Sequence, residues 1–197
     1  MRTCKTIQLG PKDNRGDHDF YSTEPRATAH LFATLKSVGL CLPYLCIEPS
    51  VGTGHIAKML QLTGHAVYCY DIVDRGFPGT YVCDWKQVVR PTEEPLGIVM
   101  NPPYCEALEH LTHALDMLHD GEICCALLRL QFLETIKRKV FFEKYPPRYV
   151  AVFSFRIKCN KNNDDSFMGG KGSHSAIAFA WYIWQKGYKG KPELLWI

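Results

Sequence analysis

The amino-acid sequence predicts a single α/β domain, with a mostly parallel sheet, helices on both faces and an antiparallel hairpin near its C-terminal end. Short apolar segments alternate with helix-like segments along most of the chain. Glycines or paired prolines end several of these segments, as expected for turns. The last two apolar segments, 148–155 and 176–184, are joined without a helix. That short connection favours an antiparallel pair of strands.

Seven strands and four helices are expected. Ser22 and Pro25 are typical of a helix start, and Gly39 of its end. A later helix carries Leu108, Leu111, Leu115 and Leu118 on one stripe. The expected strands are 44–47, 66–70, 81–83, 96–100, 123–130, 148–155 and 176–184; the expected helices follow Pro25, cover 56–62, follow Tyr104 and cover 131–144.

The composition suits one ordinary globular domain. The chain has 197 residues, 46% of them hydrophobic, and a formal net charge of +3. We expect residues 1–18, which are polar and mixed in charge, to form a flexible arm, and residues 19–197 to form the domain. The small net charge is compatible with a polyanionic partner without demanding one.

The cysteines and histidines predict no metal site. The nine cysteines form no C-x-x-C pair, and most lie in apolar runs, so we expect reduced, buried thiols. His110 and His113 lie on one side of a predicted helix without a ligand set around them, so we expect ordinary surface or half-buried histidines. No apolar run is long enough to span a membrane. Without a secretory signal, the cytoplasm is the expected compartment.

A glycine-rich turn follows the first predicted core strand. Gly52 and Gly54 allow close approach of a ligand to the backbone and a sharp entry into the next helix. Asp71 lies 19 residues after Gly52, at the end of the second core strand, where a carboxylate can bind ribose hydroxyls. Glu48 precedes the turn and is poorly placed beside a pyrophosphate. It suits a cofactor with a cationic end, such as S-adenosylmethionine.

The most specific motif is Asn101-Pro102-Pro103-Tyr104, which follows the apolar segment 96–100. An aromatic amine is a poor nucleophile because its lone pair is delocalised into the ring. Two acceptors on its N–H bonds favour a more nucleophilic nitrogen, and the Asn101 side-chain oxygen and the Pro102 carbonyl are candidates for them. Tyr104 offers a face on which a base can stack. These residues predict methylation of an exocyclic amine, with the target base flipped out of a duplex.

Together these motifs resemble the amino-methyltransferases of the Rossmann-like class I, S-adenosylmethionine-dependent fold. The resemblance is greatest to small, phage-type DNA N6-adenine methyltransferases and extends from about Asp19 onward. It implies transfer of a methyl group to N6 of adenine in DNA, in the host cytoplasm if the protein is phage-encoded. We expect a monomer or a weak homodimer. The motif around Tyr21 and Thr23 departs from the family's pattern, because Glu24 stands before Pro25.

The resemblance also implies a role for each matching residue. The catalytic set is Asn101, Pro102, Pro103 and Tyr104. The implied cofactor-binding set is Tyr21, Thr23, Glu48, Pro49, Gly52, Gly54, Asp71, Ile72, Asp84, Trp85 and Asn101.

The chain has no room for a separate target-recognition domain, so loops are expected to read the target. The segment 156–174 is the best candidate, because its basic and amide side chains suit phosphates and base edges. The implied nucleic-acid contacts are Arg156, Lys158, Lys161 and Lys171. A solvated hairpin loop is the competing interpretation of this segment.

Several activities remain open. Adenine in RNA, N4 of cytosine and protein glutamine are alternative targets for the same tetrad. A methyltransferase-like binding module that has lost catalysis is the alternative outside enzymes, although the intact tetrad, glycine turn and Asp71 argue against it. A nicotinamide oxidoreductase explains the glycine turn and leaves the tetrad unexplained.

Overall fold

The structure is a computed structural model that describes residues 21–157, 159–161 and 177–197, with only the backbone considered for Asn160 and Lys161. The expected N-terminal arm, residues 1–18, lies outside the described residues. So do Lys158 and Lys171, two of the expected nucleic-acid contacts.

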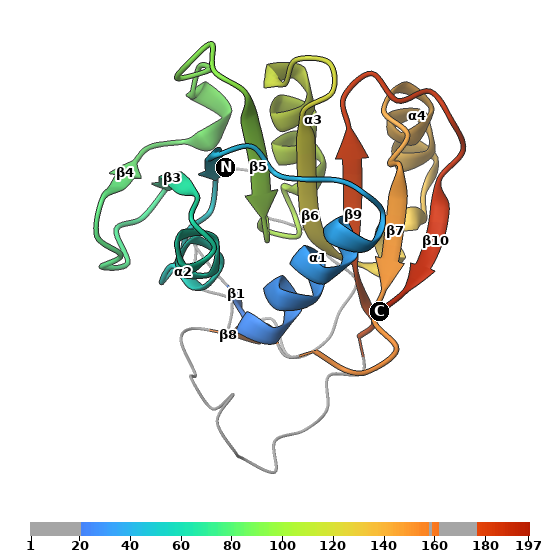
Figure 1. The fold of residues 1–197 in the computed structure, drawn as a ribbon, viewed down its shortest axis with the longest axis horizontal. Helices are drawn as coiled ribbons and strands as arrows, with labels where there is room; N and C mark the ends of the chain where they lie inside the picture. The colour runs from blue at the N-terminus through green and yellow to red at the C-terminus, as the bar shows by residue number, and fades with distance from the viewer. Residues whose placement is uncertain (1–20, 158, 162–176) are drawn as a thin grey trace.

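The described chain forms one large twisted sheet (Figure 1). Its strand order is β10-β7-β9-β6-β5-β2-β3-β4, and all neighbouring strands are parallel except on the two sides of β9. The predicted antiparallel hairpin is therefore confirmed, with β9 as the reversed strand. The strands are β2 (Leu45–Glu48), β3 (Ala66–Asp71), β4 (Thr80–Val82), β5 (Leu96–Met100), β6 (Ile123–Arg129), β7 (Tyr149–Val152), β9 (Phe179–Gln185) and β10 (Glu193–Trp196).

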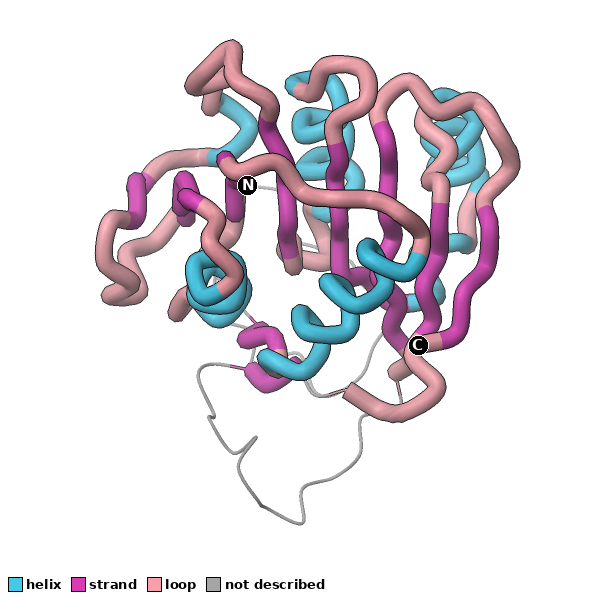
Figure 2. Tube along the Cα trace, viewed as in Figure 1, coloured by secondary structure: helices cyan, strands magenta, loops and turns pink. Residues whose placement is uncertain are grey.

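Helices cover both faces of this sheet, as predicted (Figure 2). The helices α1 (Pro25–Ser37) and α2 (His55–Leu62) pack their apolar stripes on one face. The helices α3 (Ala107–Met117) and α4 (Ile136–Lys144) lie on the other face. The two layers bury separate apolar clusters, so the sheet is enclosed between them.

The reversed strand β9 ties the two layers together through alternating tryptophans. Trp181 faces the cluster that contains α1, and its indole N–H donates to the carbonyl of Ala27 at 2.8 Å. Trp184 faces the opposite cluster and donates to the carbonyl of Tyr145 at 3.0 Å. Since both indoles are buried, these hydrogen bonds satisfy donors that would otherwise be costly.

The structure corrects four sequence-based expectations. The sheet has eight strands rather than seven, because β10 adds to β7 at an edge where Leu194 and Trp196 are exposed. The last two predicted strands have other bounds: the structure has 149–152 where 148–155 was expected, and 179–185 where 176–184 was expected. The expected helix 131–144 is broken, since a 3-10 turn over Leu130–Leu133 precedes α4. His110 is buried rather than at or near the surface.

The break before α4 has a local cause. Thr135 takes a positive φ of 88°, which a β-branched residue seldom adopts, and its hydroxyl caps α4 by accepting from the N–H of Arg138. The α-helix therefore begins at Ile136, although the run of helix-forming residues alone predicted a helix from residue 131.

The cysteine expectation is confirmed for the apolar strands. Cys46, Cys69, Cys124 and Cys125 are free and buried, whereas Cys41 and Cys105 are exposed, contrary to the expectation of buried thiols. Across the described ranges, no group of three or more metal-binding side chains comes together. No helix in these ranges combines the length and apolar character needed to cross a membrane.

A largely buried ion pair lies at the edge of the sheet where β5 and β6 begin. The carboxylate of Glu122 accepts two hydrogen bonds from the Arg90 guanidinium, at 2.8 and 2.9 Å. It also accepts from the backbone N–H groups of Leu96 and His119, at 2.8 and 2.7 Å. Burial alone raises the pKa of Glu122, but the bonds from Arg90, His119 and Leu96 outweigh it and lower the pKa overall.

Glu122→Gln should therefore lower the free energy of unfolding at neutral pH by about 2 kcal/mol, measured by urea denaturation. Because the folded pKa is lowered, the ionised carboxylate stabilises the fold above its unfolded-state pKa. That stability is lost as the pH falls through the folded pKa. The variant should lack this part of the acid sensitivity, and the exposed Glu109→Gln is the matched control. Equal pH dependence in wild type and Glu122→Gln would contradict the assignment.

Candidate active site

The strand order brings the three sequence motifs to one edge of the sheet. β5, β2 and β3 are parallel neighbours, so their carboxyl ends lie side by side. The glycine turn follows β2, Asp71 ends β3, and Asn101 follows β5. In open sheets of this kind, ligands bind at this edge.

Asp71 is held in place by the backbone around it. One carboxylate oxygen accepts from the N–H of Gly52 at 2.8 Å, and the other from the N–H of Val73 at 3.1 Å. Gly52 has a positive φ of 55°, which favours glycine at this turn. The carboxylate is thereby fixed beside the turn, with lone pairs left for a further donor.

Glu48 is a buried acid at the same turn. It is only 2% exposed, and its Oε2 has no hydrogen-bond partner. Burial raises its pKa well above the usual value; the N–H of Ala57 opposes this rise, and the charge of Asp71 adds to it. A buried carboxyl oxygen without a partner is costly, and a cationic group bound beside the turn would relieve that cost.

Gly54 begins α2 in a conformation that leaves no space for a side chain. Its φ is 81°, and a Cβ atom there would lie 2.1 Å from the ring of Phe77. Gly54→Ala should cost about 2 kcal/mol of unfolding free energy, through backbone strain and overpacking. In a Phe77→Ala background the same substitution should cost only about 1 kcal/mol, because the strain alone remains. Equal costs in both backgrounds, measured by urea denaturation, would rule out the clash with Phe77.

Asn101 is oriented by a segment that is distant in the sequence. Its Nδ2 donates to the carbonyl of Tyr21 at 2.9 Å and to the Thr23 hydroxyl at 3.0 Å. Both N–H bonds of the amide are thus used. Its Oδ1 is buried without a partner. The amide therefore presents a fixed acceptor to any donor that enters the site.

Tyr21 and Thr23, which accept the hydrogen bonds of the Asn101 amide nitrogen, belong to a small second sheet. The strands β1 (Tyr21–Thr23) and β8 (Cys159–Lys161) pair in antiparallel register, with Ser22 opposite Asn160. Neither strand was predicted, because each has only three residues and most of them are polar. The sequence interpretation did place Tyr21 and Thr23 near the cofactor, and the structure places them against Asn101.

Tyr104 is packed on several sides. The Arg129 guanidinium carbon lies 4.3 Å from its ring centroid. The rings of Tyr21 and Phe179 lie 5.2 and 6.0 Å away. In this arrangement the face under Arg129 is not open to a stacked base. The sequence interpretation gave Arg129 and Phe179 no role in the site; the signal for Arg129 was a charged residue that ends an otherwise apolar strand.

The remaining predicted residues differ in their exposure and contacts. Ile72 is 53% exposed at the end of β3, as a residue that contacts a bound ring would be. Asp84 precedes a 3-10 turn and accepts from the N–H of Lys86. Trp85 is only 2% exposed and donates to the carbonyl of His110 at 3.3 Å, so it belongs to the core below α3. Pro49 and Pro102 are buried, and the Pro103 carbonyl accepts from the N–H of Glu106 at 3.0 Å.

Of the four expected nucleic-acid contacts, only Arg156 has a described side chain. Arg156 is exposed beyond the end of β7. Lys161 lies in β8, where only its backbone is described.

No protein-family model matches the chain. No curated protein sequence matches it either. Solved structures do match. A type I restriction-modification methyltransferase subunit from Streptococcus thermophilus has a TM-score of 0.63 at 14% identity, over 90% of this chain and 47% of that chain. A provisionally named RNA methyltransferase from Pyrococcus horikoshii has a TM-score of 0.58 at 15% identity, over 84% of each chain.

A third match shows how widely the activities of these proteins differ. A magnesium protoporphyrin IX methyltransferase from Synechocystis, solved with bound S-adenosylmethionine, has a TM-score of 0.56 at 10% identity, over 83% of this chain and 79% of that chain. At such identities the likeness concerns the fold and not the substrate. The chain therefore has the Rossmann-like fold of the class I S-adenosylmethionine-dependent methyltransferases, with one additional edge strand.

Proposed function

We propose that this protein transfers a methyl group from S-adenosylmethionine to the N6 amino group of adenine in DNA. The observation that carries the proposal is the Asn101 amide. Its nitrogen is bound to Tyr21 and Thr23, and its buried oxygen has no partner. An acceptor held this way at the carboxyl edge of the sheet suits an amine donor.

The glycine turn and its acids fit S-adenosylmethionine. The unpartnered Glu48 oxygen suits the cationic methionine end, and the fixed Asp71 carboxylate suits the ribose hydroxyls. Ile72 and Asp84 would border the adenine ring of the cofactor. When bound, the cofactor supplies an electrophilic methyl group on its sulfonium. Matches to solved methyltransferases, one of them with this cofactor bound, support the assignment.

The residues of the tetrad act on the amine. Asn101 Oδ1 accepts one N–H bond of the target, and the Pro102 carbonyl accepts the other. The nitrogen lone pair is thereby turned toward the methyl group. The new N–C bond would form as the S–C bond of the bound cofactor breaks, with that bond's electron pair left on sulfur, while Asn101 and Pro102 hold the accepting nitrogen. The nitrogen then releases one proton to solvent, so no strong base is required. Positioning supplies most of the catalysis.

The exposed Arg156 and the restriction-modification match support DNA as the substrate. RNA is the second candidate, because another match of similar quality carries the name of an RNA methyltransferase. Residues 19–197 would act as one domain, as a monomer or a weak homodimer.

The purified protein should incorporate label from methyl-labelled S-adenosylmethionine into DNA, and mass spectrometry of the digested DNA should identify N6-methyladenine. RNA and a protein mixture are assayed in parallel, with Asn101→Ala as the inactive control. Label in RNA alone, in cytosine or in protein glutamine would replace the proposed substrate. Failure of S-adenosylmethionine to bind in a calorimetric titration would remove the enzyme assignment.

A further inference from the structure

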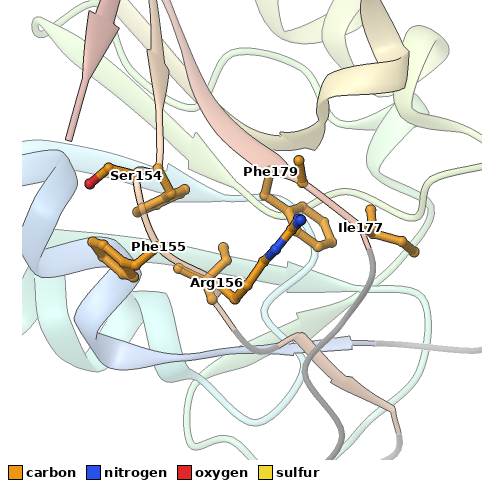
Figure 3. A pocket seen from close by; sticks show the side chains of 8 residues that line it. Ser154, Phe155, Arg156, Ile177 and Phe179 are labelled. Carbon is orange, nitrogen blue, oxygen red and sulfur yellow. The ribbon is translucent and has the colours of Figure 1, made fainter.

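A cavity lies next to the tetrad at the same edge of the sheet. It has a volume of about 250 Å³ and lies where β7 ends and β9 begins (Figure 3). Its walls come from two short segments, 153–157 and 177–179. None of these residues takes part in the proposed methyl transfer.

One aromatic ring, that of Phe179, lies between the cavity and Tyr104 of the tetrad. Phe179 lines the cavity, is 5% exposed, and lies 6.0 Å from the Tyr104 ring. Anything held in the cavity is therefore separated from the proposed target-base site by the Phe179 side chain. A neighbouring unit of the same polymer chain could reach it while the target occupies the tetrad.

Aromatic, apolar and polar groups share the walls of the cavity. Phe153, Phe155, Ile177 and Phe179 contribute side chains to it. Phe155 is held from outside the cavity, since the Arg26 guanidinium lies 3.7 Å from its ring centroid and His30 lies 4.9 Å away. These contacts restrict the Phe155 ring before any ligand binds. Rigid aromatic walls of this kind are typical of sites that stack a planar ring.

One wall of the cavity carries a cationic side chain, that of Arg156. Arg156 lines it and is exposed, and in Figure 3 its side chain extends toward Phe179. An apolar ligand alone would gain nothing from this guanidinium, and a bare phosphate would gain nothing from the rings. A nucleotide uses both, because its base can stack and its phosphate can pair with arginine.

We propose that this cavity holds the base of the nucleotide next to the target adenine, with Arg156 at the adjoining phosphate. The inference rests on the proposed function and adds a second recognition point to it. The chain would then read one neighbour of its target without a separate recognition domain. Phe155 and Arg156 act in positioning and specificity, and neither touches the transferred methyl group.

The test uses fluorescently labelled single-stranded DNA of about 12 nucleotides with one central adenine. Dissociation constants are measured by anisotropy with S-adenosylhomocysteine present. Removing the base on one side of the adenine, as an abasic site, should raise the dissociation constant of the wild type about 5- to 30-fold. Phe155→Ala should raise it similarly on intact DNA. On DNA with that abasic site, Phe155→Ala should cause little further loss.

Two controls lie at the opposite edge of the sheet. Tyr44→Ala removes an exposed aromatic ring there, and Lys189→Gln matches the charge lost in Arg156→Gln. Neither control should change the abasic penalty, whereas Arg156→Gln should weaken binding to intact and abasic DNA alike. The proposal would be overturned if Phe155→Ala raised the dissociation constant as much on DNA with an abasic site, on either side of the adenine, as on intact DNA. If the effects of Phe155→Ala and of the abasic site overlapped as expected but no N6-methyladenine formed, the proposed function would be refuted and the binding site would stand.

Discussion

Asn101→Ala should abolish methyl transfer while leaving affinity for S-adenosylmethionine close to that of the wild type. The substitution removes the acceptor that holds the target amine, a contact that matters most as charge develops on nitrogen. Loss of one such oriented hydrogen bond typically costs about 100- to 1,000-fold in rate, and loss of alignment adds to it. We therefore expect kcat to fall at least about 1,000-fold, measured by methyl incorporation under saturating cofactor.

Calorimetric titration of the same variant with S-adenosylhomocysteine is its internal control for folding. Thr23→Val gives a graded comparison, because it removes one of the two acceptors that orient the Asn101 amide and leaves the Tyr21 carbonyl. We expect an intermediate loss of kcat, about 10-fold. Activity that persisted in Asn101→Ala would show that this side chain does not hold the target amine.

Asp71→Ala should act on the cofactor instead of the amine. The carboxylate is anchored by the N–H groups of Gly52 and Val73, which leaves lone pairs for the ribose hydroxyls. A charge-assisted hydrogen bond contributes about 1.5 to 3 kcal/mol, so loss of the ribose contacts should raise the dissociation constant about 100-fold. The measurement is calorimetric titration with S-adenosylmethionine.

The substitution also releases the Gly52 turn, so the contact with ribose needs its own control. A 2′-deoxy analogue of S-adenosylhomocysteine should bind the wild type more weakly than the parent compound does. The two compounds should bind Asp71→Ala equally, since the partner of the missing hydroxyl is already gone. An unchanged dissociation constant in Asp71→Ala would remove this residue from the ribose site.

The parts of the fold predicted well from sequence are those with strong local signals. The segment 96–100 is apolar throughout and is followed by two prolines. Residues within and next to the strand therefore predict both its burial and its end. The broken helix before α4 shows the limit. The residues of 131–144 favour a helix, but the conformation of Thr135 redirects the chain so that Phe132 and Phe141 can pack in one cluster.

By itself, the sequence determined the alternation of strands and helices, the reversed strand near the end, and the edge where Gly52, Asp71 and Asn101 meet. These follow from chemistry that lies within a few residues, such as apolar runs, glycine turns and prolines. Only the tertiary structure decided how the site is completed. The Asn101 amide is oriented by Tyr21, 80 residues away, and Tyr104 is enclosed by Arg129 and Phe179 from two further strands. Such contacts depend on which strands become neighbours in the folded chain, and no local pattern of residues encodes that.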